Sequence, residues 1–308
     1  MDRRPLLVIA GPTASGKSRL AVRLAQALGG TVINADAMQV YRDLRVLTAR
    51  PNAVDEAIAP HRLFGHIDGA VAHSAAAWAA EARGAVAAAA LPIVVGGSGL
   101  YLRTLLDGIA PVPPIAAAIR AEVRALPVAA AHAWLARVDP AGAARLAPAD
   151  TTRVARALEV ALATERPLAD WQRDRSGGIG GDHDVRGIVL TPDRAELGVA
   201  IAQRAAAMLA DARDEVAALL ARRLDPTLPV MRAIGVAAVG AHLAGGATDA
   251  EAADRIALES RRYAKRQDTW FRHQAPPGWQ RTADPAAAFD FMSTLTGPPT
   301  STRLAARD

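Results

Sequence analysis

The 308-residue chain contains no cysteine. This absence excludes disulfide bonds, a catalytic thiolate and any zinc site with cysteine ligands. The chain also has no apolar run long enough to span a bilayer, and its N-terminal residues do not have the pattern of a signal peptide. We therefore expect a cytoplasmic protein that does not interact with membranes.

Lysine is almost absent, since only Lys17 and Lys265 occur among 36 lysine and arginine residues. A coding bias explains a general shift to arginine, so the two remaining lysines are candidates for positions that need a compact ammonium group. The formal net charge is +5 and the sequence pI is about 10.3. This charge indicates a polyanionic partner.

The most informative stretch is a buried apolar run followed by a glycine-bounded loop. Residues 6–9 have the pattern of a parallel strand buried on both faces, and the loop after them has the Walker A spacing. Backbone amides, the start of the next helix and a lysine would hold phosphate oxygens, and the final serine would bind Mg²⁺ through its hydroxyl. The predicted phosphate-binding residues are Gly11, Pro12, Thr13, Ala14, Ser15, Gly16, Lys17 and Ser18, with Ser18 also the predicted metal ligand. The loop alone does not distinguish a nucleoside triphosphate from a diphosphate ester.

Two further strands are predicted to end at the same edge of the sheet. The strand at residues 31–35 delivers Asp36, which can bind magnesium, cap a helix or act as a base. The strand at residues 91–95 ends in glycines, where motor and signalling NTPases place an aspartate that holds magnesium. This difference argues against routine ATP hydrolysis, and it leaves the Ser98 hydroxyl available to a ligand.

Proline-rich and glycine-rich segments divide the chain. They predict an α/β fold with a P-loop NTPase-like parallel sheet flanked by helices, and an inserted all-helical domain. The predicted core is residues 1–113 and 184–290, the insertion is residues 114–183, and residues 291–308 form a disordered tail. In the second part of the core, we expect a strand at 185–190 and helices at 197–222 and 250–272.

The last of these helices interleaves basic and aromatic residues between Arg261 and Arg272. Such a pattern suits phosphates and stacked bases, and the alternative is a solvated basic helix.

The ordered set of motifs resembles bacterial tRNA dimethylallyltransferases over residues 5–285. The motifs that carry this resemblance are residues 11–18, 36–41, 60–63, 74–76, 96–101, 156–160 and 264–272. The resemblance implies transfer of a dimethylallyl group from dimethylallyl diphosphate to N6 of the adenosine 3′-adjacent to the anticodon, with release of diphosphate. It also implies that the substrates are tRNAs that read codons beginning with U and that the insertion swings over the tRNA anticodon stem-loop. Mg²⁺ is the implied cofactor.

The resemblance also implies roles for particular residues. Asp36 would remove a proton from the adenine amine, Ser98 would contact the target nucleotide, and Arg204 would bind the diphosphate opposite the loop. The implied tRNA-binding residues are Asp36, Ala37, Met38, Gln39, Ser98, Arg120, Thr152, Arg153, Arg156, Arg232, Lys265 and Arg266. We expect a monomer with no obligate protein partner. Two alternatives are a small-molecule P-loop kinase, in which Asp36 activates a hydroxyl, and a non-catalytic RNA-binding protein.

Overall fold

The computed structural model describes residues 3–294, and the chain folds into two compact units. The core unit contains the chain up to Leu105 and from Gly180 onward, and the insert unit is Leu106–Ile179. No helix in the described range combines the length and the apolar character needed to cross a bilayer.

A parallel sheet forms the centre of the core unit. Its strand order is β3-β2-β4-β1-β5-β6, and every neighbouring pair is parallel. β1 lies inside the sheet, and its residues from Leu6 to Ala10 are fully buried, as their unbroken apolar run requires. The strands are β1 (Arg4–Ala10), β2 (Thr31–Asn34), β3 (His61–Arg62), β4 (Pro92–Gly96), β5 (His183–Leu190) and β6 (Gln280–Thr282).

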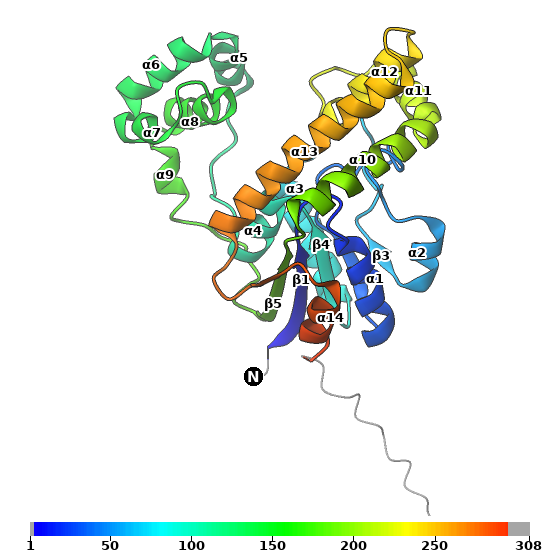
Figure 1. Ribbon diagram of the computed structural model, residues 1–308. Coiled ribbons are helices and arrows are strands. Elements are labelled where there is room, and N and C mark those ends of the chain that lie inside the picture. The colour runs from blue at the N-terminus through cyan, green and yellow to red at the C-terminus, as the bar shows by residue number, and fades with distance from the viewer. Residues whose placement is uncertain (1–2, 295–308) are drawn as a thin grey trace, which may run out of the picture. The chain divides into compact units, whose positions relative to one another are not determined.

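Helices flank this sheet. Figure 1 shows α10 and α13 running together across the carboxyl ends of the strands, where β1 opens into the predicted phosphate loop. The core-unit helices are α1 (Lys17–Leu28), α2 (Ala53–Ile58), α3 (Ala75–Ala88), α10 (Arg194–Asp211), α11 (Arg213–Ala221), the 3-10 helix η1 (Pro229–Arg232), α12 (Val236–Leu243), α13 (Asp249–Gln274) and α14 (Pro285–Ser293). Helix α4 (Gly99–Asp107) leads from the core unit into the insert unit.

The insert unit is helical and has its own apolar core, which includes Val123, Leu135, Val154 and Leu158. It spans Leu106–Ile179, whereas the predicted insertion was residues 114–183. Ile109 and Ser176 exchange backbone hydrogen bonds of 3.0 and 3.1 Å, which join the two connecting segments of the unit. Its helices are α5 (Ala117–Ala125), α6 (Val128–Val138), α7 (Pro140–Arg145), α8 (Thr151–Thr164) and α9 (Leu168–Trp171).

The predicted α/β class is confirmed, and three details differ from prediction. The helix expected at 197–222 is broken at the buried Ala212, which lets α11 turn away and pack against α12. The short strands β3 and β6 and the helix α14 were not predicted. Residues 291–293 of the predicted tail belong to α14, where Met292 is buried in the main core; residues 295–308 lie outside the described residues.

Candidate active site

The phosphate loop connects β1 to α1, as predicted. Ala14 and Gly16 have positive φ angles of 63° and 83°, which turn successive backbone amides toward one side of the loop. No side chain caps the start of α1, and Ser15 Oγ is buried without a hydrogen-bond partner among residues 3–294. Free amides at the start of a 12-residue helix and an unsatisfied hydroxyl are the features expected of an anion-binding loop.

Lys17 is half-buried at the start of α1, and its Nζ donates a hydrogen bond of 3.1 Å to the carbonyl oxygen of Pro12. Burial lowers the pKa of the Lys17 ammonium to about 8; the negative charge of Asp36 opposes this shift, and the positive charge of Arg204 adds to it. A bound anion would favour the charged form and raise this pKa again.

Arg204 reaches the loop from α10, and its Nη2 donates a hydrogen bond to Thr13 Oγ1. Burial lowers the pKa of Arg204, and Asp36 opposes that shift. An arginine retains its charge in such surroundings, so the loop has a permanent cation facing Thr13.

Asp36 follows β2 and sits in a turn that Asn34 fixes. The Asp36 N–H donates to Asn34 Oδ1 at 2.8 Å, while Asn34 Nδ2 donates to the carbonyl oxygens of Asp36 and Leu63, both at 3.0 Å. The carboxylate accepts a hydrogen bond from the Met38 N–H through Oδ1 at 2.9 Å. Trp78 of α3 donates from Nε1 to the Asn34 carbonyl at 2.9 Å, so a buried indole holds the turn from behind.

Ser98 supports this turn. Its Oγ accepts a hydrogen bond from the Ala37 N–H at 2.9 Å, and its side chain also hydrogen-bonds with Tyr263 of α13. Burial raises the pKa of the Tyr263 hydroxyl above its usual value, so this phenol stays neutral at physiological pH. The hydroxyl expected to contact the target nucleotide therefore holds the backbone next to Asp36 in this structure.

A cavity of about 330 Å³ brings the predicted residues together. Thr13, Asp36 and Arg204 line it, together with four predicted tRNA-binding residues, Ala37, Met38, Arg232 and Arg266. The Arg266 guanidinium lies over the Tyr263 ring, 5.5 Å from its centroid. Gln39 has a different position, because its Nε2 donates to the carbonyl oxygens of Thr48 and Ala49 at 2.8 and 3.0 Å and thereby holds a neighbouring loop.

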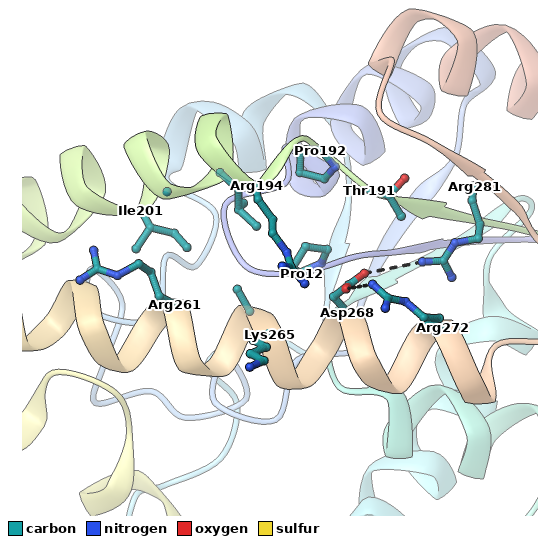
Figure 2. A pocket seen from close by; sticks show the side chains of 13 residues that line it. Pro12, Thr191, Pro192, Arg194, Ile201, Arg261, Lys265, Asp268, Arg272 and Arg281 are labelled. Atoms are coloured by element: carbon teal, nitrogen blue, oxygen red, sulfur yellow. Dashed lines mark hydrogen bonds and ion pairs between the residues drawn. The ribbon is translucent and has the colours of Figure 1, made fainter.

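A second, larger cavity of about 630 Å³ borders the phosphate loop at Pro12, between α10 and α13. Figure 2 shows Arg194, Arg261 and Lys265 around it, and within the described part of the chain none of these three side chains has an acidic partner. Asp268 is paired with Arg272 at 2.7 Å and lies 3.7 Å from Arg281. Lys265 therefore lines a cationic cavity separate from the one that Arg266 lines.

The remaining predicted tRNA-binding residues belong to the insert unit. Thr152, Arg153 and Arg156 of α8 line a cavity of about 540 Å³ in that unit. Burial lowers the pKa of Arg156; Glu159 opposes the shift, and Arg120 and Arg124 add to it. Arg120, Arg124 and Arg156 therefore lie close together, and the buried Glu159 pairs with Arg124 at 2.9 Å and with Arg156 at 3.8 Å.

Two residues important to the site were not predicted. Gln267 is 4% exposed, accepts a hydrogen bond from the Thr13 N–H at 2.8 Å and donates to the Gly97 carbonyl at 3.0 Å. Glu215 of α11 accepts hydrogen bonds from the backbone of Arg45, Val46 and Leu47 at 2.7, 2.9 and 2.7 Å, which fixes another wall of the 330 Å³ cavity. The sequence signal for Gln267 is its place on the buried face of α13, in line with Ala264 and Phe271.

Two family models match most of the chain. One described as IPP transferase matches residues 39–274, and one described as isopentenyl transferase matches residues 5–69. The chain belongs to the IPP transferase family. A tRNA dimethylallyltransferase of Sphingopyxis alaskensis is 59% identical over 94% of this chain and 96% of its own, and one from Rhodopseudomonas palustris is 55% identical over 95% and 94%.

Solved structures of the family have the same fold. The tRNA isopentenylpyrophosphate transferase of Bacillus halodurans matches with a TM-score of 0.67 and 30% identity over 95% of this chain and 96% of its own. A eukaryotic dimethylallyltransferase, solved acting on tRNA, matches with a TM-score of 0.79 and 25% identity over 95% of this chain and 77% of its own. Membership in the family supports the prenyltransferase prediction and not the kinase alternative.

Proposed function

We propose that this protein transfers the dimethylallyl group of dimethylallyl diphosphate to N6 of an adenosine in tRNA. The acceptor is the adenosine 3′-adjacent to the anticodon in tRNAs that read codons beginning with U. The observation that carries the proposal is that Asp36 and Arg204 line one cavity with Thr13 of the phosphate loop. A candidate base and a diphosphate-binding group thus face the same space.

The phosphate side of the cavity suits a diphosphate leaving group. Breaking the allylic C–O bond builds negative charge on the diphosphate and positive charge on the allyl carbon. The loop amides, Lys17 and Arg204 are preorganised donors at the place where the negative charge develops. Met208, Ala233 and Ile234 give the cavity an apolar wall, which suits the dimethylallyl group and helps to exclude water.

Mg²⁺ fits this loop. Ser18 is exposed at the second residue of α1, and the unsatisfied Ser15 Oγ and the uncapped helix start offer hydrogen-bond donors to the phosphate oxygens that would share the ion. Ser18 would hold the ion, and its other ligands would be phosphate oxygens and water. When bound, Mg²⁺ supplies positive charge that neutralises the leaving diphosphate.

The acceptor side uses Asp36. The exocyclic amine of adenine is a poor nucleophile because its lone pair is delocalised into the ring, so removal of a proton during attack assists the reaction. The Asp36 carboxylate keeps its place because Met38, Asn34 and Ser98 hold the turn around it. An adenine in the anticodon loop must leave its stack to reach this cavity, which costs less than extracting a paired base.

The tRNA backbone would meet arginines in both units. Arg232 and Arg266 line the cavity in the core unit. In the insert unit, Arg153 and Arg156 line one cavity, and Arg120 lies near Arg156. Lys265, together with Arg194 and Arg261, offers a further cationic surface (Figure 2). A tRNA substrate also implies a cytoplasmic location, and we propose that the protein acts as a monomer.

The test is mass spectrometry of nucleosides from unmodified tRNA incubated with the protein, Mg²⁺ and dimethylallyl diphosphate. We expect the mass of one dimethylallyl group on the adenosine beside the anticodon, and no such gain without the donor. Incubation with ATP alone should release no phosphate. An unchanged tRNA, with folded protein and intact substrates, would overturn the proposal.

A further inference from the structure

Two histidines and a glutamate meet in the core unit at a place that the proposed function does not use. His66 follows β3, His73 directly precedes the N-cap of α3, and Glu81 lies on α3. The His66 Nε2 lies 2.8 Å from one carboxylate oxygen of Glu81, and the His73 Nε2 lies 3.2 Å from the other. The His73 side chain is only 5% exposed, while those of His66 and Glu81 are 30% and 37% exposed. The cluster is therefore held in place on its inner side and open to solvent on its outer side.

The spacing of these groups is close to that of a metal site. One ligand atom from each residue lies within 4.8 Å of the other two. Zinc binds imidazole nitrogen and carboxylate oxygen at about 2.0–2.2 Å, so two ligands of a tetrahedral ion stand roughly 3.3–3.6 Å apart. The two histidine-to-carboxylate distances fall just short of this range. Small side-chain movements would admit an ion.

We propose that His66, His73 and Glu81 bind a divalent transition metal ion of the zinc type. Two imidazoles and one carboxylate suit such an ion, whereas Ca²⁺ and Mg²⁺ prefer oxygen ligands. Three protein ligands leave a fourth position for water, which the exposure of His66 and Glu81 permits. The site needs no cysteine, and the chain contains none.

The outer hydrogen bonds of the site are incomplete. The Nδ1 atoms of His66 and His73 are buried, and neither has a hydrogen-bond partner within residues 3–294. Metal-binding histidines usually donate this N–H to a protein acceptor, and loss of that partner lowers metal affinity by about 10- to 100-fold. We therefore expect an exchangeable ion rather than one that the folded protein retains through dialysis.

A bound ion would join the segment between β3 and α3 to α3 itself. The His73 N–H donates to the Tyr41 hydroxyl at 3.2 Å, and Arg42 donates to the His66 carbonyl at 3.1 Å. The same helix carries Trp78, whose indole N–H donates to the carbonyl oxygen of Asn34 in the turn that contains Asp36. Because the ion binds only the folded arrangement, it should raise the Tm in proportion to the logarithm of its concentration above Kd.

The test uses the untagged full chain, stripped with a chelator, and two metal probes. Calorimetric titration with Zn²⁺ should give one site, and Co²⁺ should give the intense visible absorption of a tetrahedral nitrogen and oxygen site. Glu81→Gln, which keeps the shape of the side chain, and His66→Ala should each weaken Zn²⁺ binding at least tenfold. His273→Ala removes an exposed histidine from α13 and should change neither signal.

Two results would overturn the proposal. One is a Zn²⁺ titration of the His66→Ala, His73→Ala double variant that matches the unchanged protein, since any ion would then bind elsewhere. The other is a Co²⁺ spectrum with only the weak bands of an octahedral aqua ion. Both readouts are independent of prenyl transfer, so they remain valid whether or not the proposed function holds.

Discussion

Gln267 holds the backbone of Thr13 across 254 positions of the chain, accepting its N–H at 2.8 Å. The other end of the same amide donates to the Gly97 carbonyl at 3.0 Å, so one buried side chain connects the phosphate loop with the loop after β4. Gly97 leaves no room for a side chain at this point, because a Cβ there would lie 2.0 Å from Gln267 Nε2. The phosphate loop is thus positioned by α13 as well as by β1 and α1.

Replacing Gln267 with methionine should weaken donor binding and lower stability. The similar shape is kept, but the Thr13 N–H loses its partner in a buried place, which costs about 1–3 kcal/mol. We expect a lower midpoint of urea unfolding and a higher KM for dimethylallyl diphosphate. Gln274→Met is the matched control and should change both quantities little, because this glutamine lies on the same helix, is exposed, and its side chain bonds only to Arg103 among residues 3–294.

Gly97→Ala should resemble the Gln267 variant because the new methyl group displaces the amide from both of its partners. Gln267→Ala would make room for that methyl group, so the double variant should lose less stability than the two single losses added together. Gly84→Ala is the control, since a Cβ there meets nothing within 4 Å and a helical glycine-to-alanine change is favourable. Full additivity of the two changes would show that Gln267 and Gly97 do not act through this contact.

The local parts of the fold were predictable from sequence because each strand and loop carries its own signal. The apolar run at β1, the Walker A spacing, and the placement of Asp36 after β2 follow from neighbouring residues alone. Gln267 and Glu215 depend on partners far along the chain, and no local pattern marks such pairings. The Glu81 cluster has nearer partners, 8 and 15 positions away, but a loop and the start of α3 separate them, so no helix or strand spacing marks the cluster either. The break at Ala212 was also not predictable from sequence. The helical pattern continues through this residue, and the chain turns where α11 packs against α12.

Asp36→Asn should abolish most of the turnover while leaving tRNA binding largely intact. The asparagine oxygen can still accept the Met38 N–H, so the turn survives, but the amide cannot take a proton. Loss of a general base lowers the rate by about 10²- to 10⁴-fold. Single-turnover kinetics at saturating tRNA measure this loss, with Asp254→Asn, an exposed acid on α13, as the control. A near-normal rate would remove Asp36 as the base.

The affinity for dimethylallyl diphosphate should fall as the pH rises above about 8. Burial lowers the pKa of Lys17 to about 8 in the free protein, so its ammonium is charged below that pH and neutral above it. The diphosphate favours the charged form, and binding near this pH should therefore take up a proton. Calorimetry in two buffers of different ionisation enthalpy would measure the uptake. Lys17→Arg, which stays charged, should show none; equal uptake in both proteins would assign the proton to another group.

Two arginines of the insert unit, Arg153 and Arg173, are almost equally exposed, but we expect their substitutions to change the salt dependence of tRNA binding differently. Arg153 is 75% exposed, lines the cavity beside Arg156 and lies 3.6 Å from Asp150, whereas Arg173 is 73% exposed, lies outside that cavity and is paired with Asp170 at 2.8 Å. If Arg153 contacts a phosphate, Arg153→Gln should lower affinity and reduce the slope of log K against log salt by about 1, because one fewer counterion is released. Arg173→Gln should leave the slope unchanged. Filter binding of tRNA over a range of KCl concentrations gives both slopes, and equal effects of the two changes would mean that charge in the insert unit acts only as a diffuse field.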